Sequence, residues 1–299
     1  MGKDVHGDSS VLKPVDDSWK GLALTSDVNP YLMEANPYHG TMSAVEEVCR
    51  NLASVGARID SLADCLCFGN PRKPDIMGQF KASCEALKDA AIAVDVPYVS
   101  GNVSLYNETA EGAIPPTPVL MGIGLVKDIR KCTSSDMKKE GSIWIIGETK
   151  EEMGASLYYR HLNLESGNVP TTNFEEFMPR MEQLVQAIEN EEVVACHDIS
   201  TGGLAISIIE MCMSGVGASI ELTTDLRADI ELFSESNGRW VVQVANGCEE
   251  KFANRFDYAK QIGNVDNDII FTKEGEIISK LGIEESRKNW TNPLWKRLA

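Results

Sequence analysis

The chain of 299 residues carries 28 basic and 45 acidic residues, which gives a net charge of −17. Nucleic-acid binding needs clustered Lys and Arg to neutralise phosphates, so this charge argues against a DNA or RNA partner. No apolar run approaches the roughly 18 residues of a membrane-spanning helix. The stretch from Met1 to Lys20 is too polar for a signal peptide. We therefore expect a protein that binds neither nucleic acid nor a membrane.

The eight cysteines form no CxxC pair, and most of them lie in apolar stretches. Free cysteine commonly behaves as a small buried hydrophobic residue, which predicts a reducing compartment and a cytoplasmic location. A zinc site built from Cys65, Cys67 and a distant His stays open as an alternative. CxC is nevertheless a poor spacing for structural zinc.

The first elements follow a Pro-, Asn- and Gly-rich start. Val11 and Leu12 are apolar, but the sequence leaves open whether they begin the fold. Residues 21–40 predict a loop with one short strand. Residues 43–55 carry apolar side chains at helical spacing and end at a glycine, which predicts a helix.

Strands and helices then alternate as far as residue 126. Gly122 and Gly124 lie inside the last of these apolar runs, where glycine permits close packing against a sheet. We expect a long helix at about 74–94 and strands at 59–67, 97–100 and 119–126.

A polar, charged stretch at 131–141 marks a change in composition. We place the domain boundary there, which gives domains 1–135 and 136–299. The expected helices beyond it are 174–188, 204–213 and 251–262. The expected strands are 143–146, 193–199, 218–222, 240–244 and 269–271. Alternating elements without a short repeat predict an α/β and α+β protein rather than a solenoid.

Familiar nucleotide and hydrolase motifs are absent: there is no P-loop, no G-x-G-x-x-G that opens a helix, no H-E-x-x-H and no G-x-S-x-G. Four polar, glycine-containing clusters stand out instead, each at the end of an apolar run. They are Asn36-Pro37-Tyr38-His39-Gly40, residues 64–71, residues 100–109 and residues 197–204.

Each of these clusters has a structural alternative that the sequence leaves open. Asn36 to Gly40 is either a helix cap or an anion-binding helix N-terminus. Asp64 is either a turn acceptor or a ligand. The passage after His197 is either an anion cradle or a tight connection with Ser200 as the helix N-cap.

The third cluster, Ser100-Gly101-Asn102-Val103-Ser104-Leu105-Tyr106-Asn107-Glu108-Thr109, offers the most chemistry. Gly101 removes a side chain where a bulky group could approach the backbone. Asn102 offers a carbonyl oxygen, a hard ligand suited to Mg²⁺. Ser104 would share a face with Asn102 in an extended segment. A hairpin turn closed by local hydrogen bonds is the alternative.

Taken in order, the four clusters resemble the second half of phosphoribosylformylglycinamidine synthase subunit II. Leu232-Phe233-Ser234-Glu235-Ser236-Asn237-Gly238-Arg239 is similar to a later Phe-x-Glu-Ser motif of that family. The resemblance runs from about Asn29 to the C-terminus, and the Gly-Asn-Val-Ser-Leu-Tyr-Asn-Glu string is highly specific. It implies the aminoimidazole-ribonucleotide-synthetase-like fold: an N-terminal sheet domain that dimerises and a C-terminal α+β domain.

The resemblance also implies site residues, one by one. Asp64 and Gly101 match ATP contacts, Asn102 matches a Mg²⁺ ligand and Ser104 matches a contact to the substrate, formylglycinamide ribonucleotide. No catalytic residue is carried over, because the family's catalytic histidines lie in its first half; His39 receives no such role. Thr201 replaces an Asp usual in the family, so that turn lacks a carboxylate.

The implied enzyme is an ATP-dependent C–N ligase of purine synthesis that is inactive as this half alone. Its implied partners are the first half of the synthase, a glutaminase subunit and a small subunit, with a homodimer expected in isolation. Two alternatives stay open: a non-catalytic docking half or truncated chain, and a stand-alone homodimeric relative of aminoimidazole ribonucleotide synthetase or thiamine monophosphate kinase.

Overall fold

The computed structural model describes residues 7–292, and its first half is built on a five-stranded sheet. The strand order is β1-β2-β7-β3-β4, and only β3 and β4 run parallel. The bounds are β1 Ser10–Leu12, β2 Gly21–Asp27, β3 Arg58–Cys67, β4 Tyr98–Ser104 and β7 Thr117–Val126. A small hairpin, β5 Glu108–Thr109 and β6 Gly112–Ala113, stands apart from this sheet.

The second half contains a seven-stranded sheet in the order β14-β13-β10-β12-β8-β11-β9. Its neighbours are antiparallel except for β10 and β13. The bounds are β8 Ser142–Ile146, β9 Val193–Asp198, β10 Gly217–Leu222, β11 Trp240–Val244, β12 Ala259–Asp266, β13 Ile269–Lys273 and β14 Glu276–Leu281.

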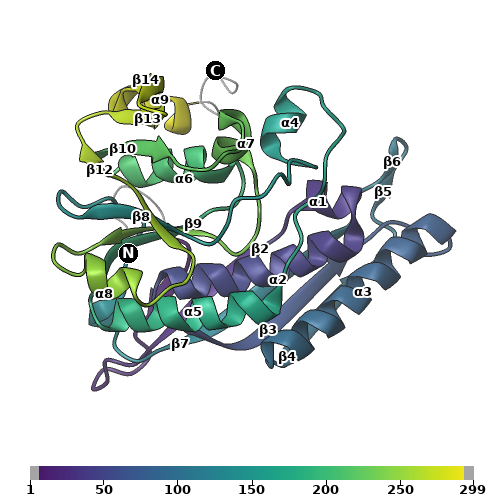
Figure 1. Ribbon diagram of the computed structural model, residues 1–299. Helices are drawn as coiled ribbons and strands as arrows, with labels where there is room; N and C mark the ends of the chain where they lie inside the picture. Colours follow the sequence, from purple (N-terminus) through teal and green to yellow (C-terminus); the bar gives the residue numbers. More distant parts are fainter. Residues whose placement is uncertain (1–6, 293–299) are drawn as a thin grey trace.

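The helices of the first half are α1 Pro30–Ala35, α2 Pro37–Ser54, α3 Pro74–Val94 and the short 3₁₀ helix η1 Ile129–Lys131. Those of the second half are α4 Leu157–His161, α5 Phe174–Glu189, α6 Gly203–Cys212, α7 Ala228–Phe233, α8 Glu249–Ala253 and α9 Ile283–Thr291. Figure 1 shows α2 and α5 between the two sheets and α3 beside α2 on the first sheet, with α6, α7 and α9 on the far side of the second sheet.

Alternation along β8 shows how the second sheet is buried on both faces. Trp144 and Ile146 join the core that α2 and α5 share with the first sheet. Ile143 and Ile145 point to the other face and pack with α6. A strand that is buried on both faces has a continuous run of apolar residues, and this run is why β8 could be predicted from the sequence. The expected mixture of helices and sheets is confirmed.

Several predicted elements differ from the structure. The expected helix at 251–262 is wrong: α8 ends at Ala253, and β12 begins at Ala259 in the middle of the sheet. Tertiary strand pairing overrides the weak helical pattern there. The expected loop at 21–40 contains α1 and the start of α2, and residues 276–281 form a further strand that was not predicted.

The region between the two sheets runs from the end of β7 at Val126 to the start of β8 at Ser142. The boundary between residues 135 and 136 stays a prediction. Within the described residues, no helix is long and apolar enough to cross a membrane.

Gly122 and Gly124 allow α2 to lie directly on the first sheet, as the sequence predicts. A Cβ added to Gly122 would lie 2.3 Å from Cγ1 of Val48, and one on Gly124 would lie 3.2 Å from a methyl group of Leu52. Val48 and Leu52 are fully buried in α2. The contact of α2 with the sheet therefore depends on the absence of side chains at these two positions.

We predict that Gly122→Ala lowers the free energy of unfolding by about 1–3 kcal/mol, because the methyl group forces a buried helix away from the sheet. Gly78→Ala is the matched control, since a Cβ in that exposed turn of α3 meets nothing within 4 Å. It should raise stability by about 0.5–1 kcal/mol through helix propensity. Urea unfolding of both variants is the measurement, and equal effects would contradict the packing argument.

Candidate functional site

The four residues proposed for the site lie together on the parallel strands β3 and β4. Asp64 is paired with Gly101, and Cys67 with Ser104, in the register of the two strands. Asn102 lies opposite Cys65. A separation of 37 positions in sequence thus becomes direct adjacency at the edge of the first sheet.

The same residues divide between the two faces of this sheet. Asp64 lies on the helix side of the sheet, in the same row as the buried Leu62 and Leu66. Its charge contributes to the raised pKa of Cys84 in α3, after the larger effect of burial. A Cβ on Gly101 would come within 2.8 Å of the Asp64 carboxylate, so a larger residue there would displace the Asp64 side chain. Burial raises the pKa of Asp64, and a hydrogen bond from the backbone N–H of Asn102 partly offsets this.

Asn102 and Ser104 share the open face of the sheet, as the sequence predicts for an extended segment. The strand continues to Ser104, so the expected strand at 97–100 ends too early and Asn102 is not a turn residue. The Asn102 side-chain Nδ2 lies 3.4 Å from the Cys65 thiol. Its carbonyl oxygen is thereby left available to a ligand.

The turn interpretation holds for the end of this cluster. Asn107 donates hydrogen bonds through Nδ2 to the backbone oxygens of Phe68 and Ser104, each 3.0 Å long. Its Oδ1 lies 3.3 Å from the Ser104 hydroxyl. Glu108 accepts from the backbone N–H of Asn70 at 2.8 Å. Ser104 is therefore held at the border between strand and turn, half-buried rather than free.

The first cluster is a helix cap. Asn36 ends α1 and begins α2, and its Oδ1 accepts a 3.0 Å hydrogen bond from the backbone N–H of His39. One of the exposed donors of this helix N-terminus is therefore satisfied from within the chain.

In the fourth cluster a carboxylate of the chain itself, that of Glu235, lies at the N-terminus of α6. Gly202, at a φ of 86°, is the N-cap of α6, so the alternative in which Ser200 is the N-cap is wrong. Oε1 of Glu235 accepts from the backbone N–H groups of Gly202 and Leu157, each at 2.8 Å. Burial raises the pKa of this Glu235 carboxyl. A carboxylate from the Phe-x-Glu-Ser segment thus occupies the position expected for an anionic ligand.

Between Glu47, Arg50, Thr201 and Glu235 a narrow hollow remains at the junction of the two halves. Its volume of about 10 Å³ leaves room for no more than about one water molecule. The helix N-terminus of α6 is therefore closed to a phosphate in this conformation.

The buried charged residues next to this hollow were not identified from the sequence. Arg50 of α2 is 1% exposed and forms ion pairs with Glu46 one turn earlier and with Asp198 at the end of β9, the latter at 3.2 Å. Burial would lower the pKa of Arg50, but these carboxylates raise it above its ordinary value. Glu46 also accepts from the backbone N–H of Gly238 at 3.1 Å. A basic residue at i+4 from an acidic one is the only hint in the sequence, and it is typical of exposed helices too.

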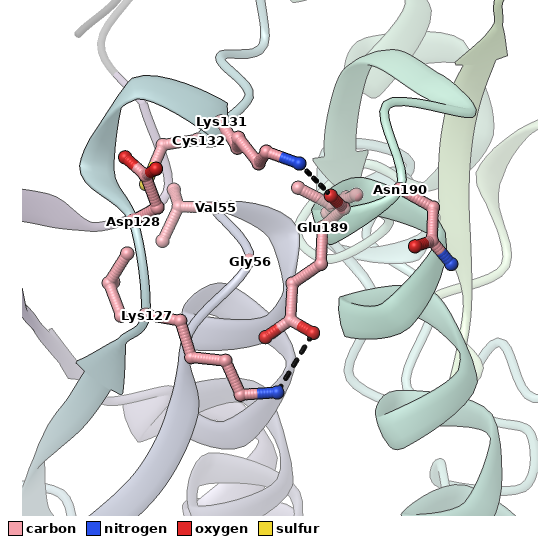
Figure 2. Close-up of a pocket in the computed structure, with 10 residues that line it drawn as sticks. Val55, Gly56, Lys127, Asp128, Lys131, Cys132, Glu189 and Asn190 are labelled. Carbon is pink, nitrogen blue, oxygen red and sulfur yellow. Dashed lines mark hydrogen bonds and ion pairs between the residues drawn. The ribbon is translucent and has the colours of Figure 1, made fainter. Parts of the chain in front are cut away.

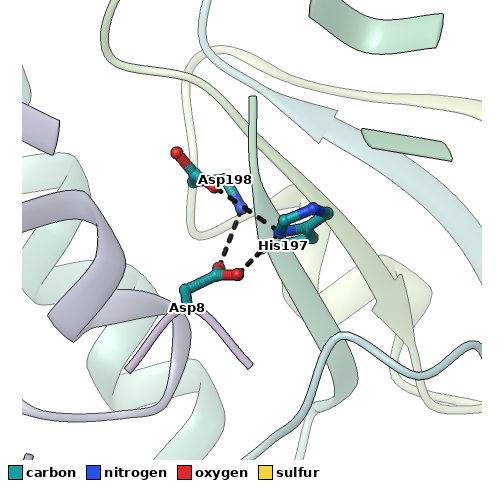
Figure 3. Close-up of side chains that lie close together, drawn as sticks. All are labelled: Asp8, His197 and Asp198. Carbon is teal, nitrogen blue, oxygen red and sulfur yellow. Dashed lines mark hydrogen bonds and ion pairs between the residues drawn. The ribbon is translucent and has the colours of Figure 1, made fainter. Parts of the chain in front are cut away.

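His197 continues this network toward the start of the described chain (Figure 3). Its Nδ1 lies 2.7 Å from Asp8 Oδ1, and its Nε2 lies 2.9 Å from Glu210 Oε2. Asp8 also accepts from the backbone N–H of Asp198 at 3.0 Å. Burial alone would lower the pKa of His197, but the surrounding carboxylates raise it well above its ordinary value.

Asp8, His197 and Asp198 have the donor atoms of a metal site, but their hydrogen bonds argue against one. A histidine that ligates a metal must be neutral and have a free nitrogen. Here both ring nitrogens face carboxylates, and Asp198 already pairs with Arg50. The cluster is therefore an ion network that joins residue 8 to the second sheet.

The pKa shifts of His197 and Asp8 determine how the stability of the fold depends on pH. His197 has a raised pKa, so its contribution to stability is complete below about 6.5 and is lost as the pH rises through the folded-state pKa. The pKa of Asp8 is lowered: burial acts to raise it, but His197 outweighs burial. Its contribution is complete above about 3.9 and is lost as the pH falls through its folded-state value.

We predict that His197→Gln lowers the free energy of unfolding by about 3–5 kcal/mol at neutral pH, because it leaves buried carboxylates without their cation. His161→Gln, at an exposed position in α4, should change it by less than about 0.5 kcal/mol. The measurement is urea unfolding of both variants across a pH series. A difference between wild type and His197→Gln that does not shrink at alkaline pH would contradict the assignment.

Figure 2 shows a second hollow, where β7 ends beside the C-terminus of α5. Lys127 Nζ lies 3.1 Å from a carboxylate oxygen of Glu189, and Lys131 Nζ donates to the Glu189 backbone oxygen at 2.8 Å. Burial raises the pKa of Cys132, at its edge, to about 11. Both ammonium groups already have partners in Glu189. These contacts join the first half to α5 and leave neither lysine free to bind a ligand.

Comparison with known proteins follows the two-sheet division of the fold. Residues 6–126 match the family described as AIR synthase related protein, N-terminal domain, and residues 140–272 match its C-terminal domain. A curated relative, phosphoribosylformylglycinamidine synthase subunit PurL of Methanothrix thermoacetophila, is 38% identical over 97% of this chain and 40% of its own length. PurL of Thermococcus sibiricus is 41% identical over 89% of this chain and 38% of its own. The chain therefore spans about 40% of the length of the curated relatives it matches.

Solved structures share the fold at low sequence identity. PurL of Thermotoga maritima complexed with FGAR has a TM-score of 0.80 at 16% identity, over 94% of this chain and 48% of that one. The hydrogenase maturation protein HypE in complex with ATP has a TM-score of 0.65 at 18% identity, over 87% and 85%. These neighbours show the shared fold. Both domain matches and the PurL relatives together show that the chain belongs to the AIR synthase related protein family, among the relatives of PurL.

Proposed function

We propose that this chain supplies one half of a phosphoribosylformylglycinamidine synthase, the ATP-dependent C–N ligase that forms an amidine in purine synthesis. The observation that carries the proposal is the similarity to PurL along 97% of this chain. Related PurL structures are described as complexes with FGAR, ADP and ATP, and another as PurLQS. The proposed partners are accordingly the first half of the synthase, a glutaminase subunit and a small subunit.

In the proposed reaction the amide oxygen of formylglycinamide ribonucleotide attacks the γ-phosphate of ATP, which forms a phosphorylated amide and releases ADP. Ammonia from the glutaminase then displaces phosphate and leaves the amidine. Positioning supplies most of the rate in such transfers, since the phosphoryl group needs little covalent help from the protein. In this half, Asp64 and Gly101 are the proposed nucleotide contacts, and Ser104 is the proposed substrate contact.

Mg²⁺ would neutralise phosphate charge in this reaction. Asn102 can offer it one carbonyl oxygen, because its Nδ2 points to Cys65. The nearest carboxylate in the strand register, Asp64, lies on the other face of the sheet. One amide oxygen does not hold a cation that demands six ligands. We therefore propose Asn102 as one ligand of a metal whose other ligands come from ATP and the first half.

We predict that the purified chain forms no amidine from ATP, Mg²⁺, ammonia and formylglycinamide ribonucleotide, because none of its assigned residues acts as a base. Addition of the first half of a PurL relative should give ATP hydrolysis that depends on the amide substrate. The assay measures phosphate release with and without that substrate. Amidine formation by the chain alone would refute the half-enzyme proposal, and complex formation without turnover would favour a docking role.

For Asn102 we expect a loss of Mg²⁺-dependent nucleotide binding in the reassembled enzyme when it is changed to Leu. The fold should survive, because the side chain is exposed on an edge strand. Asn264→Leu, on an exposed position of β12, is the matched control and should bind nucleotide normally. Calorimetry with and without Mg²⁺, beside a melting curve, measures both effects. Unchanged nucleotide affinity per folded molecule would remove Asn102 from the metal site.

The open face of the first sheet is the proposed contact with the other half, or with a second copy in isolation. Met121 and Leu125 of β7 are 37% and 51% exposed on it, beside Leu22 and Leu24 of β2. Figure 1 shows the helices of the described chain on the opposite side of this sheet. An apolar face of this kind is typical of an interface.

We predict that the isolated chain is a dimer and that Met121→Glu with Leu125→Glu makes it a monomer, because each carboxylate would have to be buried unpaired. Ile92→Glu, on a side chain of α3 that is 72% exposed, is the control and should leave the dimer intact. Light scattering over a micromolar dilution series decides the matter. A wild-type monomer at every concentration, with no binding to a first half, would count against the proposed interface.

A further inference from the structure

Two thiols lie side by side on the open face of the first sheet, within the proposed site but unused by it. Cys65 and Cys67 are two residues apart on β3, so their side chains point the same way. Their sulfur atoms are 3.8 Å apart. Both side chains are partly exposed, whereas Cys49, Cys196 and Cys212 are buried.

The distance between the two sulfur atoms is suitable for the binding of one metal ion by both thiolates. Zinc binds thiolate sulfur at about 2.3 Å with tetrahedral angles, which places two sulfur ligands about 3.8 Å apart. A disulfide would need the sulfurs at about 2.05 Å. The backbone of β3 is held on both sides, by β4 and by β7, so the strand resists the bend that such a bond requires.

A neighbouring amide completes the polar surroundings of the pair. Nδ2 of Asn102, directly across the ladder, lies 3.4 Å from the Cys65 sulfur and donates toward it. A hydrogen bond to sulfur stabilises the thiolate form that binds a metal. Among the described residues, no third His, Cys, Asp or Glu completes the group. Within that range the zinc alternative with a distant His finds no support, and two or more coordination positions stay open.

We propose that Cys65 and Cys67 form an open dithiol site that chelates one thiophilic cation such as Zn²⁺ or Cd²⁺. Soft thiolate ligands select such ions over Mg²⁺, which prefers oxygen. The site is thus chemically distinct from the proposed Asn102 magnesium ligand one strand away. Its open positions would admit water or an exchangeable ligand rather than form a closed structural centre.

The test is a Cd²⁺ titration of the reduced full chain, followed by sulfur-to-metal charge-transfer absorbance. We expect one equivalent to bind per chain, and Cys65→Ser with Cys67→Ser to abolish that absorbance. Each single variant should weaken binding at least about tenfold, since one thiolate cannot chelate. Cys84→Ser with Cys132→Ser is the matched control and should titrate as wild type does.

Excess Mg²⁺ should not displace the Cd²⁺, which separates this site from the proposed magnesium site. A melting curve for each variant shows that lost binding is not lost folding, and Cys65→Ala with Cys67→Ala provides a second route if the serines unfold the chain. Stoichiometric absorbance in a folded variant that lacks both cysteines would overturn the proposal. So would a wild-type chain without charge-transfer absorbance. Neither synthase activity nor a first half enters the assay. A parallel titration of the Met121→Glu, Leu125→Glu variant separates loss of the dithiol site from its burial in the proposed dimer, because a second copy would not cover the open face of that variant.

Discussion

The arrangement of the two halves depends on one buried cation, Arg50. It lies in α2, the helix between the two sheets, and reaches Asp198 at the end of β9 while Glu46 holds it from its own helix. Removal of these charges from water is costly, and the attraction between them offsets the cost only when every group has a partner. The Trp240 side chain adds a 3.2 Å hydrogen bond from Nε1 to the Arg50 backbone oxygen. Sequence segments almost 150 positions apart are thereby fixed in one register.

The same junction explains why the N-terminus of α6 is closed. Arg239, which is fully buried, donates to the backbone oxygens of Ser234 and Ser236 at 2.6 and 2.8 Å. These bonds shape the loop that presents Glu235 to the N–H groups of two helix starts. A carboxylate in that position satisfies the donors that a phosphate would otherwise use. Thr201 is exposed beside it. The donors at these two helix starts are therefore satisfied from within the chain.

The residues proposed for binding lie at the edge of the first sheet. β3 and β4 bring a carboxylate, a glycine, an amide, a hydroxyl and two thiols into one small area, with the carboxylate on one face and the thiols on the other. No single face holds a full set of ligands for phosphate and Mg²⁺. A composite site, completed by another polypeptide on the open face, is consistent with the apolar side chains of β2 and β7 beside it.

By itself the sequence determined the local elements with strong apolar periodicity: the long helix α3, the buried strand β8 and the glycine-bearing strand β7. It also determined the family resemblance, because the string from Gly101 to Glu108 is highly specific. It failed at β12, where a helical pattern is overridden by strand partners far away in the chain. Only the tertiary structure decided that His197 is enclosed by Asp8 and Glu210, that Glu235 closes a helix N-terminus, and that Asp64 and Asn102 face opposite sides of one sheet. The physical reason is that hydrophobic periodicity is written within one element, whereas ion pairs and strand register join residues that no local pattern relates.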